Sequence, residues 1–273
     1  MSYNTMQELC PEEKAMPLSK FYYDYPVHDL PQEEKDQLFA DPVDYRKIPD
    51  APHFLDWFTP LGEYTDYESA HCMFPDGSGF ISTYIRLPKD LDVKKIFWYL
   101  NWLNFHCKSQ PEGTGNIRYK IWNPADHWDH YFINWKDKSE GIHTTESLDL
   151  GEGDRQYDTI RHPYNMREYG LTQEIMDRCG VGEMGEYETF DFEGAHLCFG
   201  QIRPHPEGGF ERRSAEWIGW RPENGKIVRV EKTPCSEEYL KKVAYHTVLE
   251  WKHLTTFIDD LYDEYSKLPN DAD

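Results

Sequence analysis

Positive charge is scarce in this chain. Its 273 residues include 29 lysines and arginines against 50 aspartates and glutamates, for a net charge of −21. Nucleic acids and anionic membrane surfaces are bound through positive patches, so the composition argues against both as partners. We expect a cytoplasmic protein with a small substrate, either neutral or converted with the help of a metal ion.

Long apolar runs and closely spaced cysteines are also missing. No stretch approaches the length of a membrane span, and the N-terminal residues show no basic segment followed by an apolar one. Neither a membrane anchor nor a signal peptide is therefore predicted. The six cysteines are scattered and form no C-x-x-C pair. This spacing predicts reduced thiols rather than a zinc finger or a redox pair.

Aromatic side chains are abundant, with 9 Trp, 19 Tyr and 14 Phe. Each buries a large area, so they supply a core although only 38% of the residues are apolar. Residues 1–70 show no sustained period beyond one short helix at 32–39. We interpret them as an N-terminal extension suited to a dimer contact, followed by a main domain at 71–273.

The main domain shows mostly strand patterns. Residues 74–79 (F-P-D-G-S-G) predict a hairpin turn, and residues 90–106 have helical spacing. Because few helices interrupt the strands, antiparallel pairing is expected rather than a βαβ plan. The predicted strands are 80–87, 117–122, 188–203, 214–221 and 225–231.

One long helix is predicted at the end of the chain. Ser236 is a suitable N-cap, two glutamates follow it, and nothing breaks the helix before about Leu268. Its apolar residues form one stripe with charged residues opposite. The sequence therefore predicts an α+β fold, with an antiparallel sheet curved around a long C-terminal helix.

The segment 117–130 (I-R-Y-K-I-W-N-P-A-D-H-W-D-H) concentrates residues that carry chemistry. Its predicted strand ends at Asn123-Pro124, which places His127 and His130 at a strand exit, where metal ligands and proton-transfer groups are well placed. An aromatic-rich surface turn is an equally good interpretation of this segment alone.

His246 and Glu250 lie four residues apart on the predicted helix. That spacing stacks the two side chains on one face, as when one helix supplies two ligands to one metal ion. A surface His-Glu pair is the commoner outcome for so short a motif. Nitrogen and carboxylate ligands suit Zn²⁺, and also Fe²⁺ or Mn²⁺. Further candidate ligands are His127 and His130, together with four residues of an apparent acidic loop at 141–154, namely His143, Glu146, Asp149 and Glu152.

Two later histidines and one short motif offer other roles. His196 and His205 are each candidates for a proton donor, although a turn is the favoured interpretation for His205 between two prolines. The H-x-D of His127 and Asp129, followed by His205 and an arginine at 212 or 213, also fits a non-haem iron oxygenase. That interpretation leaves His246 and Glu250 without a role.

Together these residues resemble a known family, the 2,4-diacetylphloroglucinol hydrolases and related phloretin hydrolases. The resemblance runs from about Cys72 to the C-terminal helix. It is carried by P-D-G-S-G at 75–79, R-Y-K-I-W at 118–122 with Pro124 and His127, W-I-G at 217–219, and His246-x-x-x-Glu250.

The resemblance implies a Bet v 1-like (START-like) helix-grip domain with a small N-terminal dimerisation part. It also implies zinc-dependent cleavage of the carbon–carbon bond between an acyl group and a phloroglucinol ring, and thus a small aromatic ketone as substrate. By resemblance, His127, His246 and Glu250 match zinc ligands. The fourth ligand is a glutamate, for which we choose Glu146 over Asp149 and Glu152.

The remaining roles also follow from the resemblance. Tyr119 matches a substrate-binding tyrosine with a part in catalysis, and Glu146 is expected to switch between ligand and base. His130 stands where relatives carry Asn and is a candidate substrate-binding residue. His196 is the choice for the catalytic histidine. A non-catalytic binder of aromatic ligands is the main alternative from another class, because helix-grip domains enclose apolar cavities.

Overall fold

The computed structural model describes residues 6–148, 157–181, 186–192, 196–230 and 235–273. The chain forms two compact units. The first consists of Met1–Leu30, Asp92–Arg161 and Leu249–Asp273, and the second of Pro31–Leu91 and His162–Val248. In the described part of the chain, no helix is long and apolar enough to cross a membrane.

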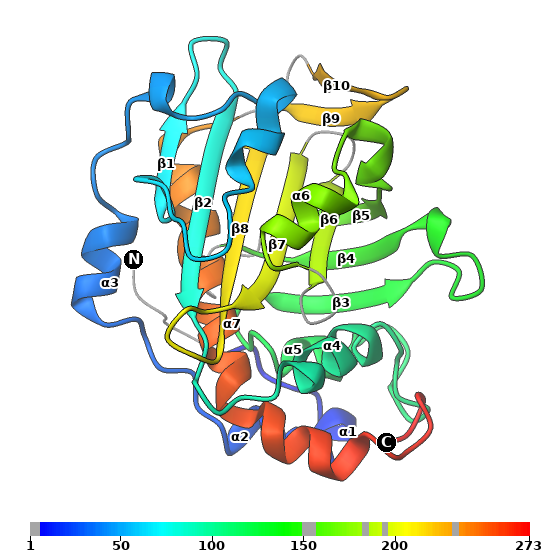
Figure 1. The fold of residues 1–273 in the computed structure, drawn as a ribbon. Coiled ribbons are helices and arrows are strands. Elements are labelled where there is room, and N and C mark those ends of the chain that lie inside the picture. The colour runs from blue at the N-terminus through cyan, green and yellow to red at the C-terminus, as the bar shows by residue number, and fades with distance from the viewer. Residues whose placement is uncertain (1–5, 149–156, 182–185, 193–195, 231–234) are drawn as a thin grey trace. The chain divides into compact units, whose positions relative to one another are not determined.

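The second unit contains five antiparallel strands in the order β1-β2-β8-β7-β6 (Figure 1). The predicted hairpin joins β1 to β2, and Gly77 takes the positive φ of 81° that the turn needs. A separate two-stranded sheet pairs β9 with β10. The bounds are β1 Ala70–Met73, β2 Gly79–Arg86, β6 Glu186–Phe192, β7 His196–Pro204, β8 Phe210–Ile218, β9 Trp220–Glu223 and β10 Lys226–Arg229.

An aromatic core covers one face of these strands. Phe54 from the 3₁₀ helix η2 stacks on Phe199 of β7 at 5.0 Å, and Phe80 and Trp217 meet edge-on at 5.1 Å. Large rings bury much area per residue, which explains how a chain of modest apolar content builds a core. The helices of this unit are α3 Gln32–Leu38, η1 Tyr45–Lys47, η2 Ala51–Trp57, η4 Met166–Tyr169 and α6 Gln173–Arg178.

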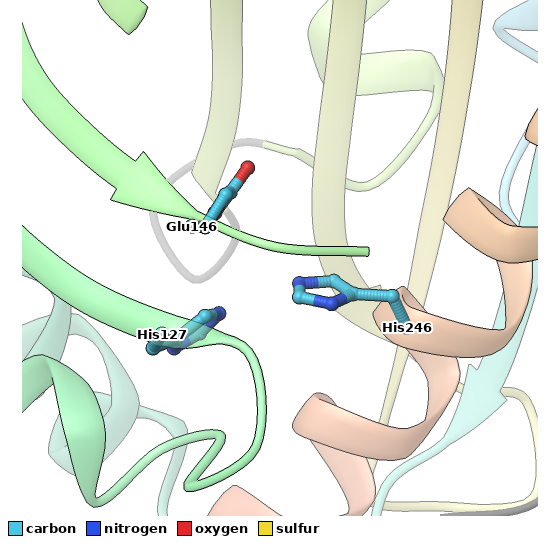
Figure 2. Close-up of side chains that lie close together, drawn as sticks. All are labelled: His127, Glu146 and His246. Atoms are coloured by element: carbon cyan, nitrogen blue, oxygen red, sulfur yellow. The ribbon is translucent and has the colours of Figure 1, made fainter. Parts of the chain in front are cut away.

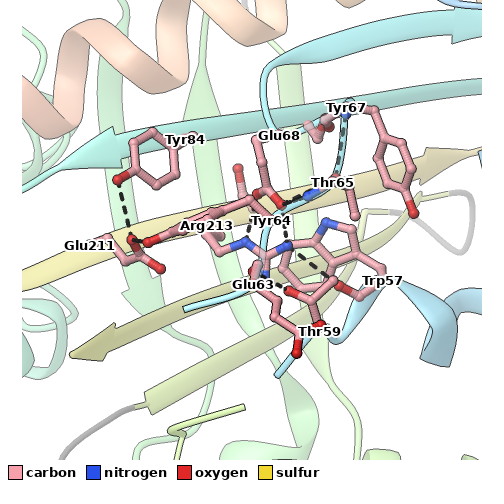
Figure 3. A network of polar contacts seen from close by, with 12 residues as sticks. Trp57, Thr59, Glu63, Tyr64, Thr65, Tyr67, Glu68, Tyr84, Glu211 and Arg213 are labelled. Carbon is pink, nitrogen blue, oxygen red and sulfur yellow. Dashed lines mark hydrogen bonds and ion pairs between the residues drawn. The ribbon is translucent and has the colours of Figure 1, made fainter. Parts of the chain in front are cut away.

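Buried ion pairs hold the segment of residues 57–68 against the same face of these strands (Figure 3). Arg213 of β8 pairs with Glu68, and Arg203 of β7 pairs with Glu211. Tyr64 donates its hydroxyl to Glu211 at 2.7 Å. Both guanidinium groups are fully buried, and both also bond to backbone carbonyls of residues 57–63. Charges buried in this way must be paired, so these arginines serve the fold.

The first unit holds the antiparallel strands β5, β4 and β3, paired in that order. Helix α4 confirms the helix predicted within residues 90–106, and Asp92 caps it. The sequence did not indicate β4 or β5, since residues 141–154 looked like an acidic loop. The bounds are β3 His127–Phe132, β4 Ile142–Glu146, β5 Tyr157–Pro163, α1 Pro11–Lys14, α2 Ser19–Tyr23, α4 Val93–Trp102, α5 Ile117–Lys120 and η3 Lys138–Glu140.

The strand predicted at 117–122 is wrong, because these residues open with the short helix α5. Asn116 sets it up. Its side-chain oxygen caps the helix by accepting from Arg118 N at 3.0 Å, while its amide donates to the carbonyls of Leu103 and His130. An asparagine at the N-cap satisfies donors that a helix start leaves open. The cluster at 127–130 therefore begins strand β3 instead of following a strand.

Three consecutive buried side chains of α5 have three different sets of partners. Arg118 stacks on Trp102 at 3.9 Å and donates to the carbonyls of Asn270 and Ala272. Lys120 donates to Glu13 at 2.8 Å. Tyr119 points toward Glu146. The two charged residues thus tie α5 to both terminal segments of the first unit.

The C-terminal helix is confirmed as α7, Glu237–Tyr265. Ser236 caps it, accepting from Tyr239 N at 3.1 Å. The predicted apolar stripe is buried from Leu240 to Tyr265. Of the residues opposite it, Thr256, Asp260 and Asp263 are exposed, whereas Lys242 and Lys252 are partly buried. The α+β class with antiparallel sheets and a long terminal helix is confirmed. The helix-grip arrangement and the boundary at residue 70 stay predictions. None of the six cysteines, all at described positions, forms a disulfide.

Candidate metal centre

A β-bulge sets the direction of His127. In the β3–β4 pair His127 lies opposite Glu146 and His130 opposite Thr144, with a register shift between His127 and Asp129. Side chains alternate along a regular strand, so residues 127 and 130 would normally face opposite sides. One extra residue reverses that alternation. The bulge therefore puts His127, His130, Thr144 and Glu146 on one face.

The hydrogen bonds of His127 fix its tautomer. Its Nδ1 lies 3.1 Å from the backbone carbonyl of Tyr119, which only accepts, so Nδ1 carries a hydrogen. Its Nε2 lies 3.0 Å from a carboxylate oxygen of Glu250. In a neutral ring that Nε2 bears a lone pair, and two acceptors at this distance require a positive charge between them. A proton or a metal ion meets that requirement, and the ring is fully buried.

Trp122 fixes the position of Glu250. The indole Nε1 of Trp122 donates to the backbone carbonyl of Glu250 at 3.0 Å, and its ring packs edge-on against His127 at 5.3 Å. Trp251, the next residue of α7, packs edge-on against the same indole at 5.7 Å. One side chain thus anchors this turn of the helix beside the histidine that Glu250 contacts.

Helix α7 also carries His246, one turn before Glu250. The helix is uninterrupted, so its own geometry relates the two side chains, and both are buried. Ligand atoms of His127, Glu146 and His246 all lie within 4.8 Å of one another (Figure 2). Two imidazoles and one carboxylate at this spacing fit Zn²⁺, and also Fe²⁺ or Mn²⁺, and Glu250 adjoins the group through its contact with His127. The donor chemistry thus agrees with a metal site.

Two neighbours hold the carboxylate of Glu146. The hydroxyl of Tyr119 donates to it, and Nη2 of Arg161 lies 3.0 and 2.8 Å from its two oxygens. Burial, and next the charge of Glu146, raise the pKa of Tyr119 well above its usual value of 10. The phenol therefore keeps its proton at neutral pH and acts as a donor.

His130 is placed beside these residues. Its Nδ1 lies 2.9 Å from the hydroxyl of Thr144, and its ring stacks on Tyr119 at 4.7 Å. Burial, and next the charge of Arg161, lower the pKa of His130 well below 6.5. The imidazole is therefore neutral at pH 7 and offers one donor or acceptor nitrogen beyond the one that Thr144 uses.

His196 has a different position. It is the first residue of β7, lies opposite Ile218, and packs edge-on against Tyr239 of α7 at 6.1 Å. Tyr239 precedes His246 by seven residues, about two helical turns or about 10 Å along the axis. His196 is therefore not among the grouped ligands. Burial lowers its pKa to about 4, so its ring is neutral at pH 7.

Other predicted candidates have separate partners or lie elsewhere. His205 sits in a turn, as favoured from its prolines, and its Nδ1 accepts from Glu207 N at 3.1 Å. Asp129 pairs with His106 at 2.7 Å, so the H-x-D motif does not join His127 in a common set of ligands. His143 pairs with Asp158 at 2.5 Å. The alternative fourth ligands, Asp149 and Glu152, lie outside the described residues.

A family model, the DAPG hydrolase PhiG domain, matches residues 48–263. The chain belongs to this family. The DAPG hydrolase match confirms the resemblance seen in the sequence and indicates a hydrolase acting on phloroglucinol derivatives. The matched region contains His127, Glu146, His246 and Glu250. Among curated proteins no match was found.

Arg161 is the residue of this site that the sequence did not reveal. It lies on β5 of this DAPG hydrolase domain, and its approach to Glu146 depends on the β4–β5 register. Thr159 and Ile160 are β-branched residues of the kind enriched in strands, and this is the signal that the sequence offers. Nothing in the spacing of a lone arginine indicates a partner across the sheet.

Proposed function

We propose that this protein is a zinc-dependent hydrolase that cleaves the carbon–carbon bond between an acyl group and a phloroglucinol ring, with a substrate of the phloretin or diacetylphloroglucinol type. The observation that carries the proposal is the His127–Glu250 contact at 3.0 Å. It sets a ring nitrogen against a carboxylate oxygen, which requires a proton or a metal ion between them, and ligand atoms of Glu146 and His246 lie within 4.8 Å of the ligand atom of His127. Such a donor set calls for a cation, and these four residues are the proposed zinc ligands.

Zinc at this position would supply Lewis acidity, which favours attack of water on an acyl carbonyl. In the overall reaction, the oxygen of water bonds to the acyl carbon and the bond between that carbon and the ring breaks. The electron pair of the broken bond goes to the ring carbon, which takes up one proton. The products are a carboxylic acid and the shortened phloroglucinol.

Three residues of the chain are assigned to the substrate in this proposal. Tyr119 keeps its proton, so its hydroxyl is available to a carbonyl or phenolic oxygen of the substrate once it leaves Glu146. Glu146 then acts as the base. His130 binds a ring hydroxyl through the nitrogen that Thr144 does not use. Each role needs only a short shift of a hydrogen bond.

His196 is proposed to deliver the proton to the ring carbon. Because its pKa is near 4, the ring does not hold a proton at pH 7 and must first accept one. It therefore works as a carrier between water and the ring carbon. The roughly 10 Å between Tyr239 and His246 along α7 is comparable to the length of a substituted aromatic ring.

The test is zinc content and phloretin cleavage, measured together on the wild type, Glu250→Gln and His246→Ala. The wild type should contain stoichiometric zinc and release phloroglucinol. Zinc affinity in both variants should fall by more than the roughly 10–100-fold that is typical when a residue bonded to a metal ligand is replaced. Turnover should fall in parallel. Asp263→Asn is the control, since that carboxylate is exposed on the same helix and should change neither quantity.

The results distinguish the hydrolase from the two alternative functions. Full zinc and full turnover in Glu250→Gln would refute the proposed ligand set. Iron in place of zinc would favour the oxygenase, and a wild type without metal would favour an aromatic-ligand binder. A homodimer formed through residues 1–70 is part of the same proposal, and light scattering on the full chain checks it.

A further inference from the structure

We propose that Arg161 is a positioning residue that serves as the resident counter-charge of Glu146. It holds the carboxylate in place when no metal is bound, and it weakens metal binding so that the metal remains exchangeable. The inference rests on the metal centre proposed above and concerns a residue that no motif of the sequence points to.

The contacts of Arg161 are those of a permanent ion pair. Its Nη2 reaches both oxygens of Glu146, at 3.0 and 2.8 Å, and the two side chains are only 15% and 10% exposed. Tyr119 donates to the same carboxylate. A carboxylate so far removed from water is costly unless a cation pairs with it. Arg161 supplies that cation within the first unit of the chain itself.

The charges around the site give Arg161 a second effect. The proposed ligands carry two negative charges, from Glu146 and Glu250, and their two imidazoles are neutral as ligands. A divalent ion held by Glu146 would lie close to the guanidinium, because that group bonds to the same carboxylate. The two cations repel each other, so Arg161 opposes the ion that shares its partner.

These two effects give Arg161→Gln an unusual signature. The glutamine keeps a donor toward Glu146 but removes the charge. The metal-free protein should unfold at least about 5 °C lower, because a buried carboxylate loses its counter-ion. Zinc should bind at least about 100-fold more tightly, because a divalent and a monovalent cation that share one carboxylate repel each other strongly even at an effective dielectric constant near 20. An arginine with only a packing role would lower stability and zinc affinity together.

The experiment uses full-length protein stripped of metal with a chelator. Zinc affinity is measured by competition with a chromophoric chelator, and the unfolding temperature by circular dichroism with and without zinc. If metal-free Arg161→Gln is too unstable for the competition assay, the readout is the rise in unfolding temperature on adding zinc. That rise should exceed the rise seen for the wild type. Turnover is not needed for either measurement.

Two further variants control the result. Arg161→Lys keeps the charge, so its zinc affinity should stay within about threefold of the wild type. Arg221→Gln removes an exposed arginine that pairs with Glu223 and should alter neither quantity. Equal or weaker zinc binding by Arg161→Gln, with a wild type that binds zinc, would overturn the inference alone. A wild type that binds no zinc would overturn the metal centre and this inference with it.

Discussion

The ion pair between Lys120 and Glu13 gives the sharpest test of how the first unit is held together. The two groups are 2.8 Å apart, and each side chain is only 2% exposed. Lys120 also donates to the carbonyl of Thr114 and lies 4.1 Å from the Trp128 ring centroid. Lys120→Met keeps the length and the apolar stem, so what changes is the charge opposite Glu13.

The expected loss follows from what Glu13 retains. Removing one partner of a buried pair typically costs about 3–5 kcal/mol. Glu13 keeps hydrogen bonds from Gln110 Nε2 at 3.0 Å and from Cys10 N at 3.1 Å, which favours the lower end. We expect Lys120→Met to lower the free energy of unfolding by about 3 kcal/mol in urea, with an unchanged dependence on denaturant.

A second variant and a control make the reasoning refutable. Adding Glu13→Gln removes the orphaned charge and should recover most of the loss, because the amide still accepts from Cys10 N. Lys14→Met on the same segment breaks an exposed pair with Glu8 and should leave the urea midpoint unchanged. A cost below about 1 kcal/mol for Lys120→Met, or a double variant no better than the single one, would contradict the argument.

Two other predictions concern neighbouring features. Burial lowers the pKa of His253 to about 4, below the value near 6.5 expected in the unfolded chain. The unfolded state therefore binds the proton more tightly, and stability that is full above pH 6.5 is lost as the pH falls toward 4. His253→Phe should remove roughly 2 kcal/mol of that loss between pH 7 and pH 5, seen as closer urea midpoints at the two pH values. Gly115 has a φ of +76°, and a Cβ there would lie 2.3 Å from the backbone oxygen of Trp128, the bulge residue. Gly115→Ala should lower the free energy of unfolding by more than the roughly 1 kcal/mol of a positive φ, and it should weaken zinc binding. Gly113→Ala, with the same φ and nothing within 4 Å, should lower it only by the backbone strain. Equal losses in the two variants would rule out the clash.

The features that the sequence predicted well are local ones. The turn at 74–79 is determined by its own residues. Helix α7 is predicted by the spacing of its apolar stripe and by the N-cap Ser236. The relation between His246 and Glu250 follows from helical geometry alone, so the four-residue spacing was sufficient. Family resemblance then selected His127 and Glu146 from the candidate ligands, because their separation along the chain carries no geometric information.

The features that were missed depend on contacts between distant segments. Residues 117–122 have the composition of a strand, but the bonds of Asn116 to residues 103 and 130 open a helix there. The bulge at Trp128 is set by pairing with β4, which itself looked like an acidic loop. Arg161 reaches Glu146 only through the β4–β5 register. Pairing of this kind is decided by the whole sheet and not by any one strand.

The segment R-Y-K at 118–120 combines one residue assigned to the chemistry with two residues that support the fold. Only Tyr119 points to the proposed chemistry, while Arg118 and Lys120 hold the helix that carries it. Several of their partners lie outside the matched region of residues 48–263, since Glu13 precedes it and the carbonyls of Asn270 and Ala272 follow it. A chain cut to 48–263 would bury an ammonium and a guanidinium without these partners, at a cost of several kcal/mol for each charge. The terminal segments are therefore part of the support of the site, and the unit that holds Tyr119 in place is larger than the family domain.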